Sequence, residues 1–454
     1  MECDVAVLGG GPGGYTAAIR AAQLGAKTIC IEKDSRLGGT CLNVGCIPTK
    51  AWVQTAYALK EAEETFAKLG VRVDEPELDF QAANDWKAAI VQQLTQGVAT
   101  LFRANGVEWV KGKGRFAGPT TIAIEGEGHV EFRQAIVATG SYPLRPPIPG
   151  IDSARCVDST GLLAQEAVPR RLVILGGGII GCEFASIFAR FGSEVTIVEM
   201  LPRLIPQEDA EAAGELAKQL RRRGITIRLD TLCEGVEEAA DALTVRLAGG
   251  DVIDTDLMLV STGRGPLVQD LGLDAIGVGY DAKAGIGADA HRRTSLPHVY
   301  AVGDVAGYWQ LAHTAFREGE VAAENACGRE AVVEGAVPRP IYTDPEIAGV
   351  GLTEEQAREQ HGDTVAVGKF PFAANGRALM QNEPGGWVKS IHETHYGELL
   401  GLVMVGPHVT DLIEAGVVAL DAESTVETVA DGMAPHPTLS EAIKEAGKKA
   451  GRTK

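Results

Sequence analysis

The chain has 454 residues, of which 45% are hydrophobic and 23% charged, as in an ordinary globular protein with more than one core. Its 61 acidic residues outnumber 42 basic ones, and the net charge of −19 argues against binding to nucleic acid. No apolar stretch reaches the roughly 18 residues needed to span a bilayer, and the first residues lack the pattern of a signal peptide. We therefore expect about three domains, a cytoplasmic location, and no membrane or nucleic-acid partner.

The first predicted unit, residues 5–33, is a β-strand, a glycine-rich turn, a helix and a second strand ending near Glu32. The turn has the GxGxxG spacing of dinucleotide-binding sites. Gly9 permits the tight turn, Gly11 lets a pyrophosphate approach the backbone, and Gly14 lets the helix pack closely on the strand. Glu32 would bind ribose hydroxyls.

Two cysteines follow in the segment GGTCLNVGCIPTK at 38–50. In a reducing compartment, a short-spaced pair is more often catalytic or metal-binding than structural. The four residues between Cys41 and Cys46 allow a disulfide if the segment curls at the start of a helix, and the residues from Ile47 onward favour that helix. Half a zinc site and buried packing are the alternatives, but zinc needs four ligands and no nearby His or Cys completes the set. We interpret the pair as a reversible store of two electrons.

The segment 134–150 then combines a strand, a glycine turn and a proline-rich crossover, which is typical of a domain linker. After it, residues 172–200 repeat the first unit. In each copy the terminal acid lies 23 positions after the first glycine. A single GxGxxG is weak evidence, but two complete copies predict two redox cofactors in one chain. The repeated residues are Gly176, Gly178, Gly181 and Glu199.

Glu199 also predicts which nicotinamide cofactor binds. A carboxylate facing the ribose 2′ position accepts a hydrogen bond from a hydroxyl and repels a 2′-phosphate. The nearest downstream basic residue, Arg203, follows a proline. The second site should therefore prefer NAD(H) to NADP(H).

The C-terminal half begins with short apolar runs. The strand within 299–307 leads to Asp304, which is placed to bond a hydroxylated chain. A helix predicted over 311–328 would favour negative charge at its N-terminus. From about residue 338 the pattern is that of an α+β domain without a third fingerprint.

These segments together resemble the FAD-dependent pyridine-nucleotide disulfide oxidoreductases over essentially the whole chain, and among them the members that oxidise dihydrolipoyl groups. The resemblance rests on both fingerprints and on GGTCLNVGCIPTK, VATG, VSTGR, YAVGDV, YTDPEIAGVGLTE, VGPHVTDLI and HPTLSEA. It implies an α/β fold with two Rossmann-like dinucleotide-binding domains, for FAD and NAD, plus an α+β C-terminal dimerisation domain. The implied domains are a first FAD-binding part at 1–148, an NAD-binding domain at 149–268, a central FAD-binding part at 269–337 and an interface domain at 338–454.

The resemblance also gives roles to the residues around the flavin. Cys46 would lie against the flavin as a thiolate, and Cys41 would exchange disulfides with lipoyl sulfur. Lys50 and Glu183 would form a pair beside the flavin. Glu183 follows the second fingerprint on an otherwise apolar helix, where an unpaired buried carboxylate would be costly, and Lys50 would explain it.

A histidine near the C-terminus is the candidate base. An unperturbed thiol is mostly protonated at neutral pH, so thiol–disulfide exchange benefits from a base. On spacing alone His436 is typical of a surface histidine, but the HPTLSEA match favours the base, with Glu441 binding its second ring nitrogen. The resemblance places this dyad opposite the cysteine pair of the other subunit in a homodimer.

The remaining cofactor-binding residues follow from the same resemblance, and no metal site is expected. The residues expected to bind FAD are Gly9, Gly11, Gly14, Glu32, Lys33, Gly39, Thr40, Lys50, Gly114, Thr139, Gly140, Asp304 and Ala312. The other residues expected to bind a cofactor are Gly176, Gly178, Ile180, Gly181, Glu199 and Gly263, together with Glu183, which is expected beside the flavin with Lys50.

The implied function is oxidation of dihydrolipoamide, or of a lipoyl domain, with NAD⁺ through Cys41, Cys46 and FAD. The implied partners are a second copy of the chain and an acyltransferase core subunit of a 2-oxoacid dehydrogenase or glycine cleavage complex. The alternatives are a related NAD(P)H-dependent disulfide reductase and a redox scaffold with little lipoamide turnover. A mercury-type reductase would need a further C-terminal cysteine pair, whereas the last cysteine here is Cys327.

Overall fold

The computed structural model describes residues 1–239 and 241–451. These residues form two compact units, which we describe separately. Unit 1 comprises Met1–Ala51, Gln81–Leu144 and Gly263–Glu334, and unit 2 comprises Trp52–Phe80, Arg145–Thr262 and the chain from Gly335 onward. The predicted mixed α/β class with Rossmann-like parallel sheets is confirmed. The predicted domain boundaries stay predictions.

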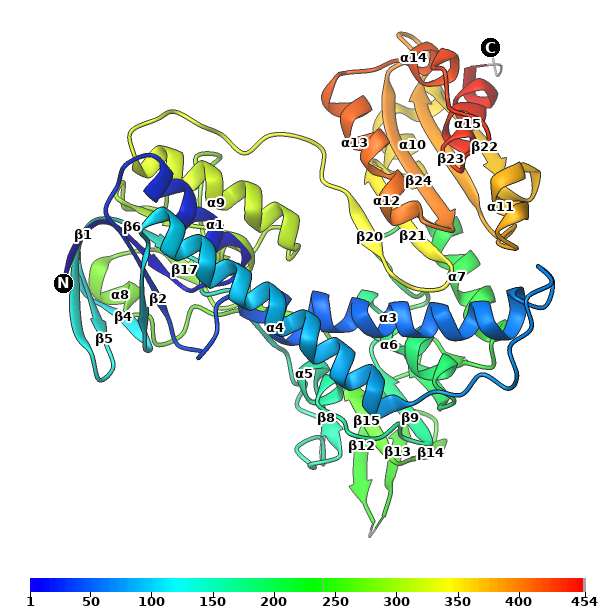
Figure 1. Ribbon diagram of the computed structural model, residues 1–454, viewed down its shortest axis with the longest axis horizontal. Coiled ribbons are helices and arrows are strands. Elements are labelled where there is room, and N and C mark those ends of the chain that lie inside the picture. The colour runs from blue at the N-terminus through cyan, green and yellow to red at the C-terminus, as the bar shows by residue number, and fades with distance from the viewer. Residues whose placement is uncertain (240, 452–454) are drawn as a thin grey trace. The chain divides into compact units, whose positions relative to one another are not determined.

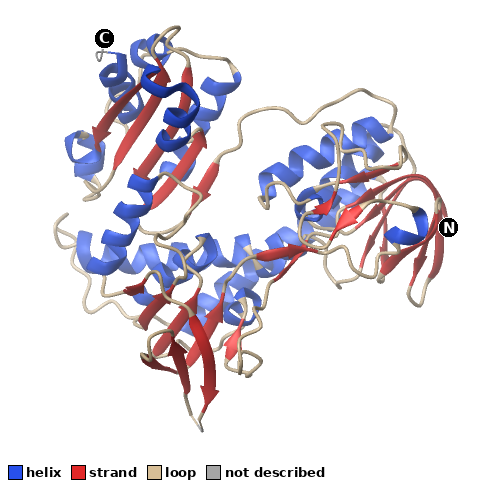
Figure 2. Ribbon diagram, turned by 180° about the vertical axis from the view of Figure 1, so that it is seen from behind, coloured by secondary structure: helices blue, strands red, loops and turns tan. Residues whose placement is uncertain are grey.

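A seven-stranded sheet forms the centre of unit 1, and its order is β3-β2-β1-β6-β5-β4 with β19 also pairing with β6 (Figures 1 and 2). The strands are β1 (Glu2–Leu8), β2 (Thr28–Glu32), β3 (Glu108–Lys111), β4 (Gly114–Gly118), β5 (Thr121–Ile124), β6 (Gly128–Val137) and β19 (Val299–Ala301). The first fingerprint provides β1 and β2, which pair in parallel with Val7 opposite Cys30. Every residue of β2 is buried, as expected for a strand covered on both faces.

Two helices, α1 (Pro12–Gln23) and α9 (Ala312–Ala326), lie side by side in unit 1 (Figure 1). They approach closely because both carry glycine at the crossing. A Cβ on Gly319 would lie 2.4 Å from the carbonyl oxygen of Gly13. The predicted helix over 311–328 is therefore present with slightly shorter bounds. The other helices wholly within unit 1 are α2 (Gly39–Val44), α8 (Leu273–Ile276) and a 3-10 turn at Gly303–Ala306.

Two longer helices cross the boundary between the units. The first, α3 (Cys46–Lys60), is the helix expected after the cysteine pair, and it continues into a short π-helix at Glu61–Thr65. The second, α4 (Phe80–Asn105), was not predicted. Trp52, on α3, is fully buried within unit 2, where its ring meets Phe188 edge-on at 5.7 Å.

The second fingerprint builds the parallel sheet of unit 2, in the order β11-β10-β9-β15-β8. Its strands are β8 (Cys156–Val157), β9 (Arg171–Leu175), β10 (Glu194–Val198), β11 (Thr226–Arg228) and β15 (Leu257–Val260). The helices that connect them are α5 (Ser159–Leu163), α6 (Ile179–Arg190) and α7 (Ala210–Arg222). An antiparallel sheet of three strands, not predicted from the sequence, consists of β12 (Cys233–Glu238), β13 (Leu243–Leu247) and β14 (Val252–Thr255).

The C-terminal part of unit 2 is the predicted α+β domain, with a five-stranded antiparallel sheet and helices beside it (Figure 2). Its strands are β20 (Arg339–Ile341), β21 (Glu346–Gly351), β22 (Val365–Pro371), β23 (Trp387–Glu393) and β24 (Leu399–Gly406). Its helices are α10 (Glu354–His361), α11 (Gly376–Met380), α12 (Val409–Leu412), α13 (Glu414–Asp421), α14 (Val426–Asp431) and α15 (Glu441–Gly451). All residues of β23 and β24 are buried.

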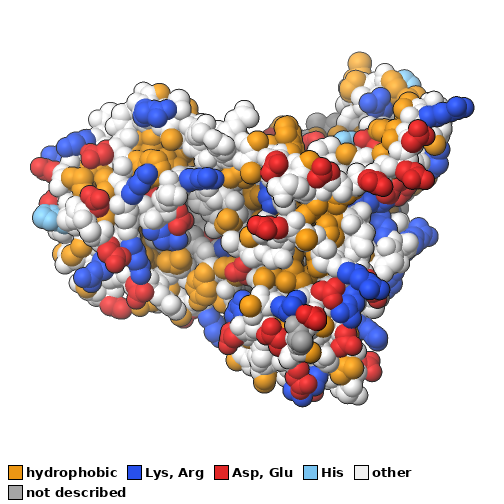
Figure 3. Space-filling view, turned by 60° about the horizontal axis from the view of Figure 1, so that its bottom comes forward, with side chains coloured by type: hydrophobic (Ala, Val, Ile, Leu, Met, Phe, Trp, Pro, Cys, Tyr) orange, Lys and Arg blue, Asp and Glu red, His pale blue; other side chains and the backbone are white. Residues whose placement is uncertain are grey.

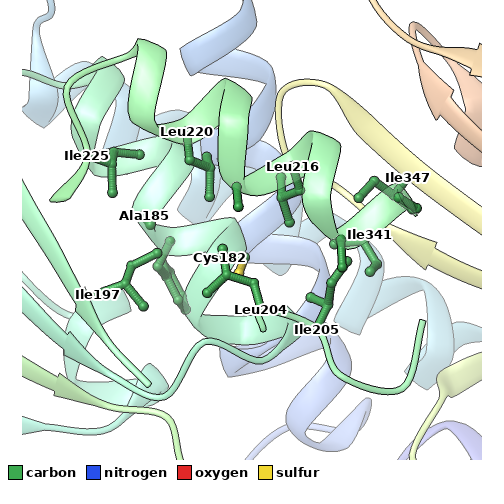
Figure 4. Close-up of a cluster of buried hydrophobic side chains, with 14 of the residues drawn as sticks. Cys182, Ala185, Ile197, Leu204, Ile205, Leu216, Leu220, Ile225, Ile341 and Ile347 are labelled. Carbon is green, nitrogen blue, oxygen red and sulfur yellow. The ribbon is translucent and has the colours of Figure 1, made fainter. Parts of the chain in front are cut away.

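The largest core joins this C-terminal sheet to the parallel sheet of unit 2. Figure 4 shows part of it, with Leu204 and Ile205 in the same cluster as Ile341 and Ile347. Among the described residues, no helix is long and apolar enough to cross a membrane.

Candidate functional site

Each dinucleotide turn requires two of its glycines for internal packing. Gly9 and Gly176, at the start of the turns, have φ values of +107° and +109°, which L side chains rarely adopt. A Cβ on Gly14 would lie 1.9 Å from the Gly9 carbonyl oxygen, and a Cβ on Gly181 would lie 2.0 Å from that of Gly176. Both helices therefore pack against their strands as the spacing predicts.

The middle glycine of each turn has no such internal reason. A Cβ on Gly178 would meet no atom within 4 Å, and one on Gly11 would meet only the Cα of Gly39, at 3.8 Å. Both lie at the N-cap of a helix, where N–H groups point outward and anions are stabilised. The open space is what a pyrophosphate needs, so these residues fit a dinucleotide at each turn.

The two terminal acids occupy equivalent positions. Glu32 accepts hydrogen bonds from the N–H groups of Gly10 (2.7 Å) and Asp34 (2.9 Å). Glu199 accepts from those of Gly177 (2.6 Å) and Leu201 (2.8 Å). Both side chains are buried, and burial raises the pKa of Glu32 despite its two N–H donors. These bonds show that both acids stabilise their own turn. Each carboxylate still has lone pairs that could accept a hydrogen bond from a ribose hydroxyl.

Arg203, the one basic residue near Glu199 in sequence, is held elsewhere. Its guanidinium donates to the carboxylate of Glu355 at 3.1 Å and to the carbonyl oxygen of Pro206 at 2.9 Å. A 2′-phosphate would therefore meet Glu199 without help from Arg203, which supports the predicted preference for NAD(H).

The cysteine pair lies where two helices meet. Cys41 is in α2, Cys46 is the first residue of α3, and Gly45 separates the helices. Both cysteines are thiols, and both are partly exposed. A hydrogen bond to the Cys46 side chain raises the pKa of Cys41, burial raises it further, and the charge of Lys50 opposes both. The shift favours the protonated form of the Cys41 thiol in the reduced pair.

A residue that sequence reasoning missed lies near the pair. Burial, followed by the charges of Cys41 and Cys46, raises the pKa of Tyr15 to about 12. Tyr15 therefore stays neutral beside both sulfurs. Its position directly after Gly14 in the first fingerprint is the only sequence signal that could have drawn attention to it.

Asp304 lies at a polar junction in unit 1. Ser141, at the start of β7 (Ser141–Pro143), donates a hydrogen bond to the Asp304 carboxylate. Arg264, in β16 (Arg264–Pro266), donates to the Ser141 hydroxyl at 2.8 Å. Thr139 donates to the carbonyl oxygen of Leu267 at 2.8 Å.

A buried ion pair fixes the turn before Asp304. Glu318 accepts a hydrogen bond from the N–H of Gly303 at 2.6 Å and pairs with Arg292 at 3.1 Å. Both charged side chains are almost fully buried, and sequence reasoning missed both. The pair supports the turn that carries Asp304, because Gly303 is the residue before it.

The remaining predicted residues vary in how directly the structure explains them. Gly114 is buried in β4, where a Cβ would lie 2.6 Å from the Leu8 side chain, so sheet packing alone accounts for it. Glu183 is buried on α6 and accepts from the N–H of Tyr342 at 3.0 Å, and its pairing with Lys50 stays a prediction. The others are placed as follows: Lys33 and Thr40 are exposed, Gly39, Gly140 and Gly263 have positive φ, Ile180 is in α6, and Ala312 begins α9.

The candidate base and its partner are in contact. Nδ1 of His436 lies 2.9 Å from the Glu441 carboxylate, whose other oxygen accepts from the N–H of Thr438 at 2.9 Å. The Thr438 N–H and the bond to His436 hold the pKa of Glu441 below its usual value. The imidazole side chain is 79% exposed, so its Nε2 edge is accessible to a thiol. The two side chains that the resemblance pairs are therefore in contact, and the role of His436 as a base stays a prediction.

The zinc alternative for the cysteine pair has no ligand set. Within residues 1–239 and 241–451, no group of three or more His, Cys, Asp or Glu side chains could hold a metal ion. A tetrahedral site would need four such ligands.

Comparison with known proteins identifies the family. Residues 3–319 match the family model described as pyridine nucleotide-disulphide oxidoreductase, and residues 337–447 match the dimerisation domain of the same family. The chain belongs to this family. It is a flavin-dependent disulfide oxidoreductase, its cofactors are FAD and NAD, and its C-terminal domain is a dimerisation domain.

Its relatives agree with the predicted resemblance. The chain is 44% identical to a dihydrolipoyl dehydrogenase of Thermus scotoductus, covering 98% of this chain and 96% of the relative. It is 43% identical to the mitochondrial dihydrolipoyl dehydrogenase of Pisum sativum, covering 98% and 91%. Among solved structures, the HOCl-induced flavoprotein disulfide reductase RclA from Escherichia coli, as its Cu(II) complex, matches with a TM-score of 0.90 and 28% identity over 99% of both chains.

Proposed function

We propose that this enzyme oxidises dihydrolipoyl groups with NAD⁺, with Cys41 and Cys46 as the exchanging pair and His436 as the base. The observation that carries the proposal is the 2.9 Å contact between Nδ1 of His436 and Glu441, together with the short-spaced cysteine pair of the same chain. In the reduced pair the bond to Cys46 raises the pKa of Cys41, so a base is needed before the Cys41 thiol can attack a substrate disulfide, and the same base would take the proton of a substrate thiol in the opposite direction. The same chain supplies an exposed imidazole fastened by a carboxylate.

The exchange begins with the pair as a disulfide. A substrate thiol gives its proton to Nε2 of His436, and the resulting sulfur anion attacks the Sγ of Cys41. The bond between Cys41 and Cys46 breaks, and Cys46 leaves as a thiolate. The second substrate thiol then attacks the mixed disulfide, which releases the cyclic disulfide product and leaves Cys41 to take up a proton. The substrate has lost two electrons and two protons, and the pair has gained the electrons.

Glu441 supports the base throughout. Its ionised carboxylate bonds Nδ1, which selects the ring tautomer with Nε2 able to accept a proton and then stabilises the imidazolium. Tyr15 stays protonated near the sulfurs and adds no competing charge. FAD held beside the pair would supply the acceptor for the dithiol's two electrons, and NAD⁺ held at the second turn would supply the final hydride acceptor.

The residues proposed for the two cofactors are those predicted from the sequence. Gly9, Gly11 and Gly14 with Glu32 would hold FAD in unit 1, and Gly176, Gly178 and Gly181 with Glu199 would hold NAD in unit 2. The open Cβ positions of Gly11 and Gly178 support one dinucleotide at each turn. Asp304 would bind the hydroxylated chain of FAD from its fixed turn.

A homodimer with its active sites shared between subunits, a cytoplasmic location and a lipoyl-bearing acyltransferase partner complete the proposal. The dimerisation domain carries His436, which supports a site shared between subunits. The net charge of −19 suits a basic docking segment, although acidic and basic side chains are interspersed on the face in Figure 3.

An anaerobic titration of the FAD-loaded enzyme with dihydrolipoamide tests the proposal. Two electrons per subunit should reduce the cysteine pair and produce the long-wavelength absorption of a thiolate beside oxidised flavin. Addition of NAD⁺ should then reverse the change. A spectrum that dihydrolipoamide leaves unaltered contradicts the proposal and favours the alternatives, namely a reductase of another disulfide or a redox scaffold.

A further inference from the structure

The loop at 200–209 connects the acid of the NAD site to α7. At its start, the Glu199 carboxylate binds the N–H groups of Gly177 and Leu201. In its middle, the N–H of Ile205 donates to the carbonyl oxygen of Gly177 at 2.9 Å. The Leu204 side chain covers the same turn, since a Cβ on Gly177 would lie 2.5 Å from its Cδ2. Loop, turn and acid therefore form one hydrogen-bonded assembly.

The backbone of this loop is strained where it meets the turn. Ile205 has φ +40°, a left-handed conformation that a β-branched residue rarely adopts. Such a conformation persists only where the surroundings fix it. Ile205 is buried in the core that also contains Ile341 and Ile347 of the C-terminal sheet (Figure 4).

The far end of the loop is fastened by two buried ion pairs. Glu208 pairs with Arg339, whose Nε lies 3.1 and 3.2 Å from the two carboxylate oxygens. Asp209 pairs with Lys389, whose Nζ lies 3.1 and 3.2 Å from its oxygens. Glu208 and Asp209 are only 3% and 1% exposed. Both cations come from the dimerisation domain, and both anions come from the NAD-site loop.

Lys389 is the centre of a larger group of charges. Its ammonium also contacts Glu354 at 2.9 Å and Glu211 at 3.0 Å. Asp209 caps α7 by accepting from the N–H groups of Glu211 and Ala212. Lys389 therefore fixes both the end of the loop and the start of the following helix.

We propose that Arg339 and Lys389 of the dimerisation domain are positioning residues for the NAD site, acting through Glu208 and Asp209 on the loop that holds Glu199 and Gly177. The dimerisation domain thus sets the affinity for NAD(H) as well as carrying the base. The inference goes beyond the proposed function. It depends on the NAD site and is independent of which dithiol the enzyme oxidises.

The test removes one pair completely, because removing one partner alone would leave an unpaired buried charge. In the FAD-loaded Glu208→Gln/Arg339→Met double variant, the dissociation constant of NADH, measured by titration calorimetry, should rise by about tenfold. The KM for NAD⁺ should rise with it. The rate at which dihydrolipoamide reduces the bound flavin without NAD⁺ should stay at the wild-type value, which a general loss of structure would not allow.

A matched control is the pair Arg171–Asp256, which lies at the opposite end of β9 and is separated by 2.6 Å. The Arg171→Met/Asp256→Asn double variant removes an ion pair from the same sheet and changes no residue that contacts the loop at 200–209. The NADH affinity of this variant should equal that of the wild type. Equal NADH affinity in the Glu208→Gln/Arg339→Met variant and this control overturns the inference. Failure of the wild type to react with dihydrolipoamide would refute the proposed function but leave the NADH comparison valid.

A milder variant decides the question if the double variant loses FAD or does not fold. Arg339→Lys keeps the charge but removes the planar guanidinium, whose Nε donates to both oxygens of Glu208 and whose Nη1 donates to the carbonyl oxygen of Gly351. Its NADH dissociation constant should rise by about fivefold, at the lower end of the coupling between two sites. An unchanged constant in this folded variant overturns the inference.

Discussion

The chemistry of single residues depends on where protons are held. The hydrogen bond to Cys46 and burial keep the proton on Cys41, while the Thr438 N–H and His436 keep Glu441 ionised. A protonated thiol needs a base before it can take part in disulfide exchange, and the imidazole held by Glu441 can act as that base. Three substitutions test these assignments separately.

Cys41→Ser should lower the rate of turnover with dihydrolipoamide by at least about a thousandfold, because serine cannot form the mixed disulfide. FAD content, measured from the visible spectrum, should stay at the wild-type level. Cys327→Ser is the matched control, since Cys327 is a half-buried thiol outside the pair. Normal turnover in Cys41→Ser would remove the exchange role.

His436→Gln should slow reduction of the flavin by dihydrolipoamide by about a hundredfold, because the substrate thiol then loses its base. Stopped-flow absorbance measures this step alone. NADH reduction of the flavin should be unaffected, and His129→Gln, at an exposed strand end, should behave as the wild type. An unchanged rate in His436→Gln refutes the base.

Glu199→Gln should narrow the preference for NADH over NADPH by about tenfold, because the negative charge that repels a 2′-phosphate is lost. The ratio of the kcat/KM values for the two nucleotides measures the change. Arg203→Gln should leave this ratio unaltered, since Glu355 and Pro206 already occupy the guanidinium. A constant ratio in Glu199→Gln would place the discriminating charge elsewhere.

At the scale of elements, the two strand–turn–helix units are nearly interchangeable. In each turn the last glycine, Gly14 or Gly181, leaves no room for a Cβ beside the carbonyl oxygen of the first glycine. The middle glycine, Gly11 or Gly178, has open space at its Cβ position. The sequence pattern assigns different roles to these glycines by position, and the Cβ distances agree with that assignment. The structure separates them into glycines that the fold needs and glycines that the ligand needs.

A pair of alanine substitutions at the second turn tests this separation. Gly178→Ala should fold normally, because its Cβ meets nothing within 4 Å, but should bind NADH at least about tenfold more weakly. Gly181→Ala should lower the free energy of unfolding by about 1–3 kcal/mol, since its Cβ clashes with the Gly176 carbonyl. Thermal unfolding and NADH titration distinguish them, and equal effects in both variants would contradict the distinction.

At the scale of the whole molecule, the cysteine pair belongs to unit 1 and the His436–Glu441 dyad to unit 2. The dimerisation domain makes a second copy of the chain part of the enzyme. In the proposed two-fold dimer, each site takes its cysteines from one subunit and its histidine from the other. Two variants that are inactive alone should then restore activity when they form mixed dimers.

Mixed dimers provide the corresponding test. Cys41→Ser and His436→Gln subunits are each inactive as homodimers, but a heterodimer with shared sites has one intact site. Random re-association of equal amounts should recover about a quarter of the wild-type activity, because half of the dimers are mixed and each has one working site of two. Recovery no greater than the sum of the two homodimers would show that each subunit supplies its own base.

Much of the site could be predicted from the sequence because its information is local. Both fingerprints and the Cys41–Cys46 spacing each lie within about thirty residues, where turn geometry and helix periodicity act directly. The His436–Glu441 dyad was expected only from the family resemblance of HPTLSEA. The long helix α4 and the sheet of β12–β14 were missed, since no motif marks them. Only the tertiary structure decided which charges meet: Arg292 with Glu318, Arg339 with Glu208 and Lys389 with Asp209, the last two separated by 131 and 180 positions. No local pattern encodes these pairs, because each exists only where separate sheets and helices pack and exclude water from both charges.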